Sequence, residues 1–232
     1  MTHRPADRAR SRATTARRHS GGVKFVPLAP DTLVLRLARW IDRQGPGRLR
    51  IGFDGPPEVG TTDLADRVAA ALGTLNRPAV RVSTRFWWRA ASLRLEYGKQ
   101  DVQSRLTGWV DVPSLAREVF EPLADNGSGR YLTELRDPSR DRAIRQAYQQ
   151  APADAVLLVD GPLLLTHDLP WDRVVRIGTS AGALERALPE AAHWELEAHQ
   201  QYRRQWQQPA PVDVVLSYDH PSSPAVSGLD LR

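Results

Sequence analysis

The chain contains no cysteine, which excludes disulfides, thiolate nucleophiles and cysteine-ligated zinc. This absence is typical of a reducing compartment, and we expect a cytoplasmic protein. Long hydrophobic runs are missing as well: the longest uncharged apolar stretches, at residues 155–159 and 161–165, are far too short to span a bilayer. We therefore expect no membrane contact. The six histidines show no metal-binding spacing of the HExxH kind.

Lysine is almost absent, because Lys24 and Lys99 are the only two among 32 basic residues. The first 20 residues carry six arginines and one aspartate, which accounts for the whole net charge of +5 and leaves the rest of the chain neutral. We interpret residues 1–22 as a disordered, arginine-rich arm. Such an arm is either a solvated extension, a transit peptide or a segment that contacts nucleic-acid phosphates.

Beyond the arm, the composition is that of a globular protein, with 41% hydrophobic and 25% charged residues. Candidate strands at residues 49–53, 79–83, 155–160, 173–177 and 212–216 alternate with helical patterns. This alternation predicts an α/β fold, a three-layer sandwich with a roughly five-stranded parallel sheet and helices on both faces. We expect residues 23–232 to form a single domain.

A glycine-bounded loop follows the first predicted strand and precedes a predicted helix. Gly55 and Gly60 have the spacing of a phosphate-binding loop, and Thr62 supplies the hydroxyl that such loops place on magnesium. The position that lysine normally occupies holds Thr61.

The departures from the loop pattern all weaken phosphate binding. A lysine charge near the phosphates is worth about 4 kcal/mol in a partly shielded site before desolvation. Thr61 does not supply that charge, and Glu58 adds a negative one. Pro56 and Pro57 each remove an N–H donor. A plain strand–turn–helix without a ligand remains an alternative interpretation.

Several segments in the right order resemble the uridine kinase family of P-loop nucleoside kinases, in its actinobacterial form. They are residues 53–56, 60–66, 91–98, 152–159 and 160–165. The resemblance implies the P-loop kinase fold. It also implies an activity that uses ATP and Mg²⁺ to phosphorylate a nucleoside 5′-hydroxyl.

The resemblance also assigns roles to individual residues. It places the nucleotide-binding loop at Gly55, Val59, Gly60, Thr61 and Thr62. It places Mg²⁺ at Thr62 and Asp160, and it makes Arg203 and Arg204 candidates for a phosphate-binding lid. The family's general base corresponds to Arg85, and an arginine cannot accept the hydroxyl proton.

The phosphate clamp and the proton acceptor are thus both replaced. Phosphoryl transfer depends on positioning and charge neutralisation, so we predict a protein that binds a nucleotide or a pyrimidine nucleoside, with weak or lost transfer. The alternatives are an active nucleoside 5′-kinase with a non-standard loop, and a structural or regulatory partner.

A different enzyme class is suggested by the pattern G-x-S-x-G at Gly178, Ser180 and Gly182. In a serine hydrolase, Ser180 would be the nucleophile, with His220 as the base and Asp213 or Asp219 as the acid. No upstream HGGG-type segment accompanies the pattern, and Ser180 is equally well explained as a helix N-cap.

Overall fold

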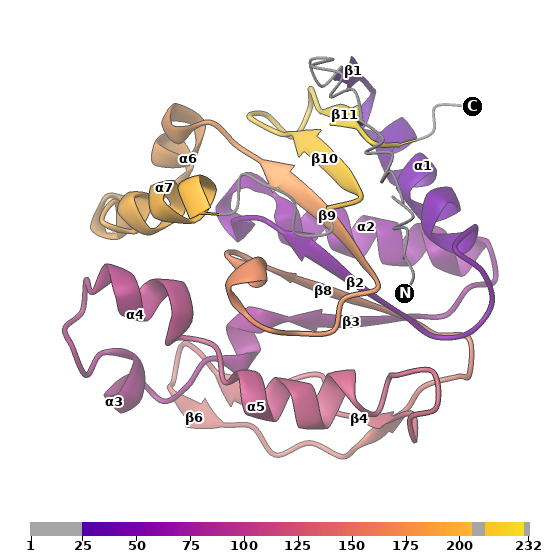
Figure 1. Ribbon diagram of the computed structural model, residues 1–232, viewed down its shortest axis with the longest axis horizontal. Coiled ribbons are helices and arrows are strands. Elements are labelled where there is room, and N and C mark those ends of the chain that lie inside the picture. Colours follow the sequence, from indigo (N-terminus) through magenta and orange to yellow (C-terminus); the bar gives the residue numbers. More distant parts are fainter. Residues whose placement is uncertain (1–24, 206–211, 230–232) are drawn as a thin grey trace, which may run out of the picture.

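The computed structural model describes residues 25–205 and 212–229. The predicted arm at residues 1–22 lies outside these ranges. The described residues contain a seven-stranded sheet (Figure 1). Its strands, in order across the sheet, are β1 (Val26–Pro27), β11 (Ala225–Ser227), β10 (Val214–Ser217), β9 (Arg173–Gly178), β2 (Leu49–Asp54), β8 (Val156–Gly161) and β3 (Ala79–Ser83).

The five strands from β10 to β3 are parallel, whereas β11 and β1 add to one edge in antiparallel orientation. This confirms the predicted α/β fold with a mostly parallel sheet. The two edge strands are not predicted from the sequence, because two or three residues are too few to show an alternating pattern.

The helices are α1 (Pro30–Asp42), α2 (Thr61–Thr74), α3 (Ala91–Arg94), α4 (Val102–Thr107), α5 (Val112–Leu115), α6 (Ala181–Ala187) and α7 (Glu195–Gln205). Helix α5 continues into a π-helical segment, Ala116–Phe120. Short 3₁₀ turns occur at Pro57–Val59, Thr84–Trp87, Leu164–Thr166 and Glu190–Ala192. Two small antiparallel sheets pair β4 (Arg130–Tyr131) with β7 (Gln149–Gln150), and β5 (Arg136–Asp137) with β6 (Arg142–Ala143).

Two hydrophobic cores lie on opposite faces of the sheet. Val156 and Leu158 of β8 face α1 and α2, while Leu157 and Val159 of the same strand face the core built around α5 and the π-helical segment. This alternation is the two-residue period of a strand, and it explains why β8 is apolar at successive positions. Helices therefore cover both faces, as predicted.

The chain crosses from β2 to β3, returns to β8 between them, and then continues to β9 on the other side of β2. The strand order therefore reverses at β2. In open α/β sheets, ligands bind beyond the carboxyl ends of the strands at such a reversal. In Figure 1 these strand ends point toward α4, α6 and α7, so any site positioned by this topology lies there.

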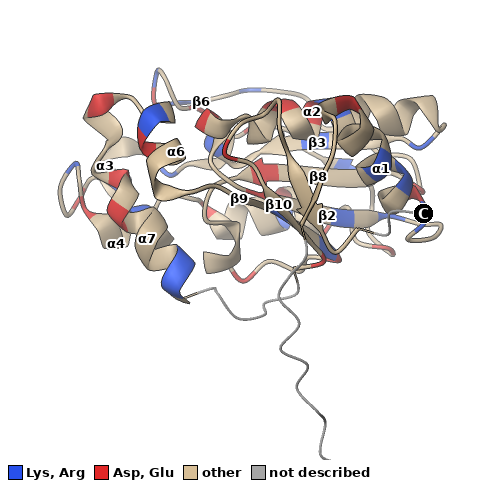
Figure 2. Ribbon diagram, turned by 90° about the horizontal axis from the view of Figure 1, so that it is seen from above, with Lys and Arg blue, Asp and Glu red and all other residues tan. Residues whose placement is uncertain are grey.

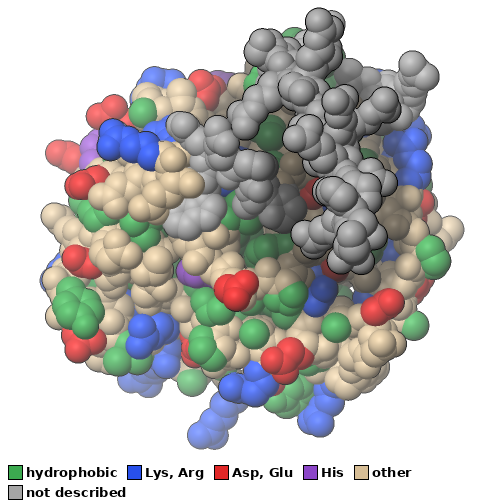
Figure 3. All heavy atoms as spheres, viewed as in Figure 1, with side chains coloured by type: hydrophobic (Ala, Val, Ile, Leu, Met, Phe, Trp, Pro, Cys, Tyr) green, Lys and Arg blue, Asp and Glu red, His purple; other side chains and the backbone are tan. Residues whose placement is uncertain are grey.

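Charged residues of both signs are interspersed over the helices and strands (Figure 2). On the face shown in Figure 3, hydrophobic side chains lie among charged ones rather than in one broad patch. Within the described part of the chain, no helix is both long enough and apolar enough to cross a membrane.

Candidate functional site

The loop after β2 forms a tight turn that leads directly into α2. Pro57–Val59 is a 3₁₀ turn, and Gly60 has a φ of 95°, which a residue with a side chain adopts only under strain. A Cβ at Gly55 would lie 2.7 Å from both the Ile177 Cβ and the Thr61 Oγ1. Gly60 is thus required by the backbone conformation of the turn, and Gly55 by the close packing around it.

Thr61, at the lysine position, is fully buried and turned into the loop. Its Oγ1 donates a hydrogen bond to the Pro56 carbonyl at 2.7 Å. The Val59 side chain is also buried, in the core shared with α1 and α2. Both side chains therefore hold the loop together, and neither extends from it toward a ligand.

Some of the backbone donors of the loop are used within the protein. The Gly55 N–H bonds the Gly161 carbonyl at 2.9 Å, and the Gly60 N–H bonds the Pro57 carbonyl at 2.9 Å. Pro56 and Pro57 have no N–H to offer. A phosphate cradle needs several N–H groups directed at the anion, so this loop provides fewer donors than its glycine spacing predicts.

The two candidate magnesium ligands are in contact. Thr62 Oγ1 donates a hydrogen bond to Asp160 Oδ2 at 2.7 Å. Asp160 is buried and also accepts from Ser83 at Oδ2 and from Arg81 at Oδ1. These residues do not fit Mg²⁺, because the single carboxylate is already paired with a guanidinium. Among the described residues, no three His, Asp or Glu side chains are grouped to hold a metal.

A second buried carboxylate ends β2. Asp54 accepts hydrogen bonds from the Tyr202 hydroxyl at 2.6 Å, the Arg176 Nε at 3.3 Å and the Leu164 N–H at 3.0 Å. Burial raises the pKa of Asp54, and these partners oppose the shift. The Leu164 N–H follows Leu163, a non-glycine residue with a φ of 62°. Sequence reasoning missed this network, although a polar residue at the end of a buried strand was a signal for it.

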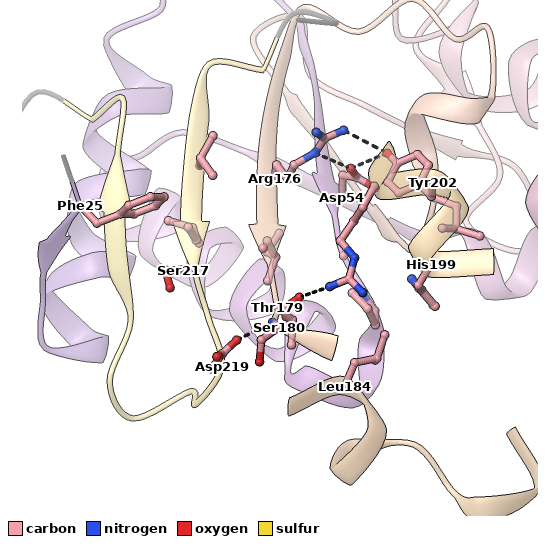
Figure 4. Close-up of a pocket in the computed structure, with 18 residues that line it drawn as sticks. Phe25, Asp54, Arg176, Thr179, Ser180, Leu184, His199, Tyr202, Ser217 and Asp219 are labelled. Carbon is pink, nitrogen blue, oxygen red and sulfur yellow. Dashed lines mark hydrogen bonds and ion pairs between the residues drawn. The ribbon is translucent and has the colours of Figure 1, made fainter. Parts of the chain in front are cut away.

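A cavity of about 390 Å³ opens beside the loop, at the carboxyl ends of β2, β9 and β10 (Figure 4). The polar residues that line it are Asp54, Arg176, Thr179, Ser180, His199, Tyr202, Arg203, Ser217 and Asp219. The Thr179 Oγ1 is buried there without a hydrogen-bond partner in the described structure. Burial lowers the pKa of His199 to about 3, so its imidazole is neutral at physiological pH.

The two lid candidates have different surroundings. Arg203 lines this cavity and donates to the Thr179 carbonyl at 2.8 Å. Arg204 is exposed and lines a separate polar groove beside α4 and α7. Only Arg203 is therefore placed where it can contact a ligand in the cavity.

Arg85, at the position of the expected base, is exposed on the Thr84–Trp87 turn, with its guanidinium 5.3 Å from the Phe86 ring. It does not line the cavity. Desolvation raises the pKa of Glu58 in the neighbouring loop, and Arg85 and Arg105 oppose that shift. Arg85 thus adds positive charge near the acidic residue of the loop.

The hydrolase interpretation gains no support from the geometry. Ser180 Oγ accepts from the Ala183 N–H and caps α6. Asp219 accepts from the Ser180 backbone N–H, and His220 Nδ1 bonds to the Ser222 hydroxyl. No hydrogen bond joins Ser180 to His220 in the described structure, so the Ser–His contact of a hydrolase is missing.

Comparison with protein-family models finds no match to this sequence, and a search of curated proteins finds none either. Solved structures do match. One is a possible uridine kinase from Bacillus stearothermophilus, with a TM-score of 0.64 and 18% identity over 78% of this chain and 96% of that one. The chain has the fold of P-loop kinases.

A second solved structure with this fold is a "putative fructose transport system kinase" from Silicibacter sp. TM1040. Its TM-score is 0.57, with 19% identity over 80% of this chain and 98% of that one. At these identities the likeness establishes the arrangement of strands and helices, and function has to be argued from the site.

Proposed function

We propose that the chain binds a nucleoside or nucleotide and that phosphoryl transfer by it is weak or lost. The observation that carries the proposal is the conformation of the loop between β2 and α2. Its threonine at the lysine position bonds the loop's own Pro56 carbonyl, and a cavity lies open beside it. The binding part thus rests on the cavity, and the loss of transfer rests on the loop.

The cavity supports a ligand of nucleoside size. Its volume of about 390 Å³ lies within the range of small-molecule sites, roughly 300–1,000 Å³. Leu184, Ile177 and Leu216 provide apolar surface for a planar base, whereas Arg203 and Thr179 provide polar contacts. This combination of apolar walls and a few convergent polar groups is typical of cofactor and nucleoside sites.

Weak transfer follows from three replacements. Thr61 places no cation beside the phosphates, Arg85 cannot accept a proton, and Glu58 repels a triphosphate. Phosphoryl transfer relies on charge neutralisation and in-line positioning. A bound nucleotide would therefore lack the groups that stabilise charge in the transition state.

The test is titration calorimetry with ATP, uridine and cytidine, together with an assay for nucleoside monophosphate formation. We expect binding of at least one ligand and turnover far below the 1–100 s⁻¹ that is roughly typical of kinases. Turnover within that range would contradict the loss of transfer. Absence of binding to all three ligands would contradict the binding proposal.

Substitutions of Arg203 and Arg204 form a matched pair that tests whether the ligand binds in the cavity. The Arg203→Ala variant should weaken binding by about 10- to 150-fold, because a hydrogen bond to a charged group contributes roughly 1.5–3 kcal/mol. The Arg204→Ala variant removes the same charge from outside the cavity and should bind like the wild type. If both variants lost affinity equally, the ligand would bind outside the cavity that Arg203 lines.

A further inference from the structure

Arg81 of β3 makes three side-chain contacts, two with the neighbouring strand β8 and one with helix α2. It donates to Asp160 Oδ1 at 2.7 Å, to the Leu158 carbonyl at 2.7 Å and to Asp66 Oδ1 of α2 at 2.8 Å. Arg81 is paired with Leu158 in the strand register, and Ser83 with Asp160. The guanidinium is thus held between two strands and one helix.

Asp160 has both of its oxygens occupied by the protein. Oδ1 accepts from Arg81, and Oδ2 accepts from Thr62 and Ser83. Its side chain is 1% exposed, so water does not compensate its charge. A buried carboxylate of this kind requires a cation, and here the guanidinium supplies it.

We propose that Arg81 takes the place of a divalent cation at Asp160, so that the chain binds its ligand without a metal ion. A divalent ion at Thr62 and Asp160 would have to approach a fixed positive charge that already holds Oδ1. The ion would also have to displace a charge-assisted hydrogen bond, which is among the stronger contacts in proteins. The ligand part of the inference rests on the function proposed above, and the metal part does not.

The other buried carboxylate at this edge of the sheet is compensated in the same way. Asp54 at the end of β2 is paired with Arg176 of β9, as Asp160 is paired with Arg81 of β3. In each case the arginine comes from the adjacent parallel strand. Neither of these two buried aspartates is therefore left with an uncompensated charge for a metal ion.

The experiment measures Mn²⁺ binding to the ligand-free protein by electron paramagnetic resonance. The wild type should leave Mn²⁺ free at millimolar concentration. Arg81→Gln should gain about one Mn²⁺ per chain, because the vacated Oδ1 and its charge become available. The double variant Arg81→Gln, Asp160→Asn should lose that gain, which assigns the ion to Asp160.

Two controls separate this effect from general disturbance. Arg50→Gln breaks another arginine–aspartate pair on the sheet, that with Asp172 at 2.9 Å, and should gain no Mn²⁺. Thermal unfolding of Arg81→Gln should shift upward with Mg²⁺, while that of the wild type should not, because only a metal that binds the folded state stabilises it.

Three results would overturn the proposal: stoichiometric Mn²⁺ binding by the wild type that Asp160→Asn abolishes, no gain in a folded Arg81→Gln, or a gain in Arg50→Gln. If Arg81→Gln does not fold, the Mn²⁺ titration of the wild type still tests whether Asp160 holds a metal ion.

The ligand part of the inference is tested by measuring the Kd of the wild type for its ligand in Mg²⁺ and in chelator. The two values should agree within about threefold. A ligand that requires Mg²⁺ would overturn that part, whereas no binding in either buffer would contradict only the proposed function.

Discussion

At the scale of single residues, the loop shows how one side chain changes the role of a motif. The Thr61 hydroxyl is directed back at the Pro56 carbonyl, and Gly55 leaves just enough room for it. The bond ties the first turn of α2 to the start of the loop. Thr61 therefore stabilises the turn, whereas a lysine would extend out of it.

Replacing Thr61 with valine tests this structural role. Thr61→Val keeps the shape and removes the donor, so the buried Pro56 carbonyl loses its shortest hydrogen bond. We expect the free energy of unfolding to fall by about 1–2 kcal/mol, measured by urea denaturation. Thr74→Val is the matched control: its hydroxyl also bonds a carbonyl at 2.7 Å, but Thr74 is exposed. Equal losses in both variants would contradict the role assigned to Thr61.

At the scale of elements, α4 and α7 are joined beside the strand ends. Arg105 of α4 donates to Glu195 of α7 at 2.7 Å, and its guanidinium lies 4.7 Å from the Trp109 ring centre. Trp109 in turn packs against Trp194, which directly precedes α7. This contact fixes the helix that carries His199, Tyr202 and Arg203 to the cavity.

Removing the arginine should loosen α7. Arg105→Ala leaves Glu195, of which only 16% of the side chain is exposed, without its partner. We expect a loss of about 3 kcal/mol in unfolding free energy and faster amide exchange along α7. Arg117→Ala breaks a pair with Glu118 in which the arginine is 61% exposed, and it should leave both measurements unchanged. Unaltered exchange along α7 in Arg105→Ala would show that other contacts hold the helix.

At the scale of the whole molecule, two buried histidines make stability depend on pH. Burial, together with a smaller effect of the nearby Arg105 charge, lowers the pKa of His167 to about 4 and that of His199 to about 3. The unfolded chain protonates these groups near pH 6.5. Their contribution to stability is therefore fully present above that pH and is lost as the pH falls. Asp54 acts in the opposite sense, since its raised pKa favours the folded state as the pH falls.

The pH dependence can be assigned by substitution. When the pH falls from about 7.5 to about 5, each buried histidine should lower the free energy of unfolding by roughly 1–2 kcal/mol. His167→Gln and His199→Gln should each reduce the slope of stability against pH in urea denaturation. His220→Gln, which alters an exposed imidazole, should leave the slope at the wild-type value. A slope that persists in both buried-site variants would contradict the assignment.

Local pattern was enough to predict much of this molecule. The alternation of apolar runs located β2, β3, β8, β9 and β10 to within a few residues, because strand and helix periods are short-range properties. Glycine spacing located the loop. The resemblance assigned Thr62 and Asp160 to one magnesium site, and that assignment stays a prediction; the structure shows a hydrogen bond of 2.7 Å between the two side chains.

The sequence by itself thus determined the five parallel strands of the sheet and the absence of a lysine at residue 61. Only the tertiary structure decided which charged side chains form ion pairs with each other. Arg81 reaches Asp160 because β3 lies beside β8, and Arg176 reaches Asp54 because β9 lies beside β2. Strand order depends on how whole elements pack, and partners 79 and 122 residues apart leave no local pattern from which their pairing can be derived.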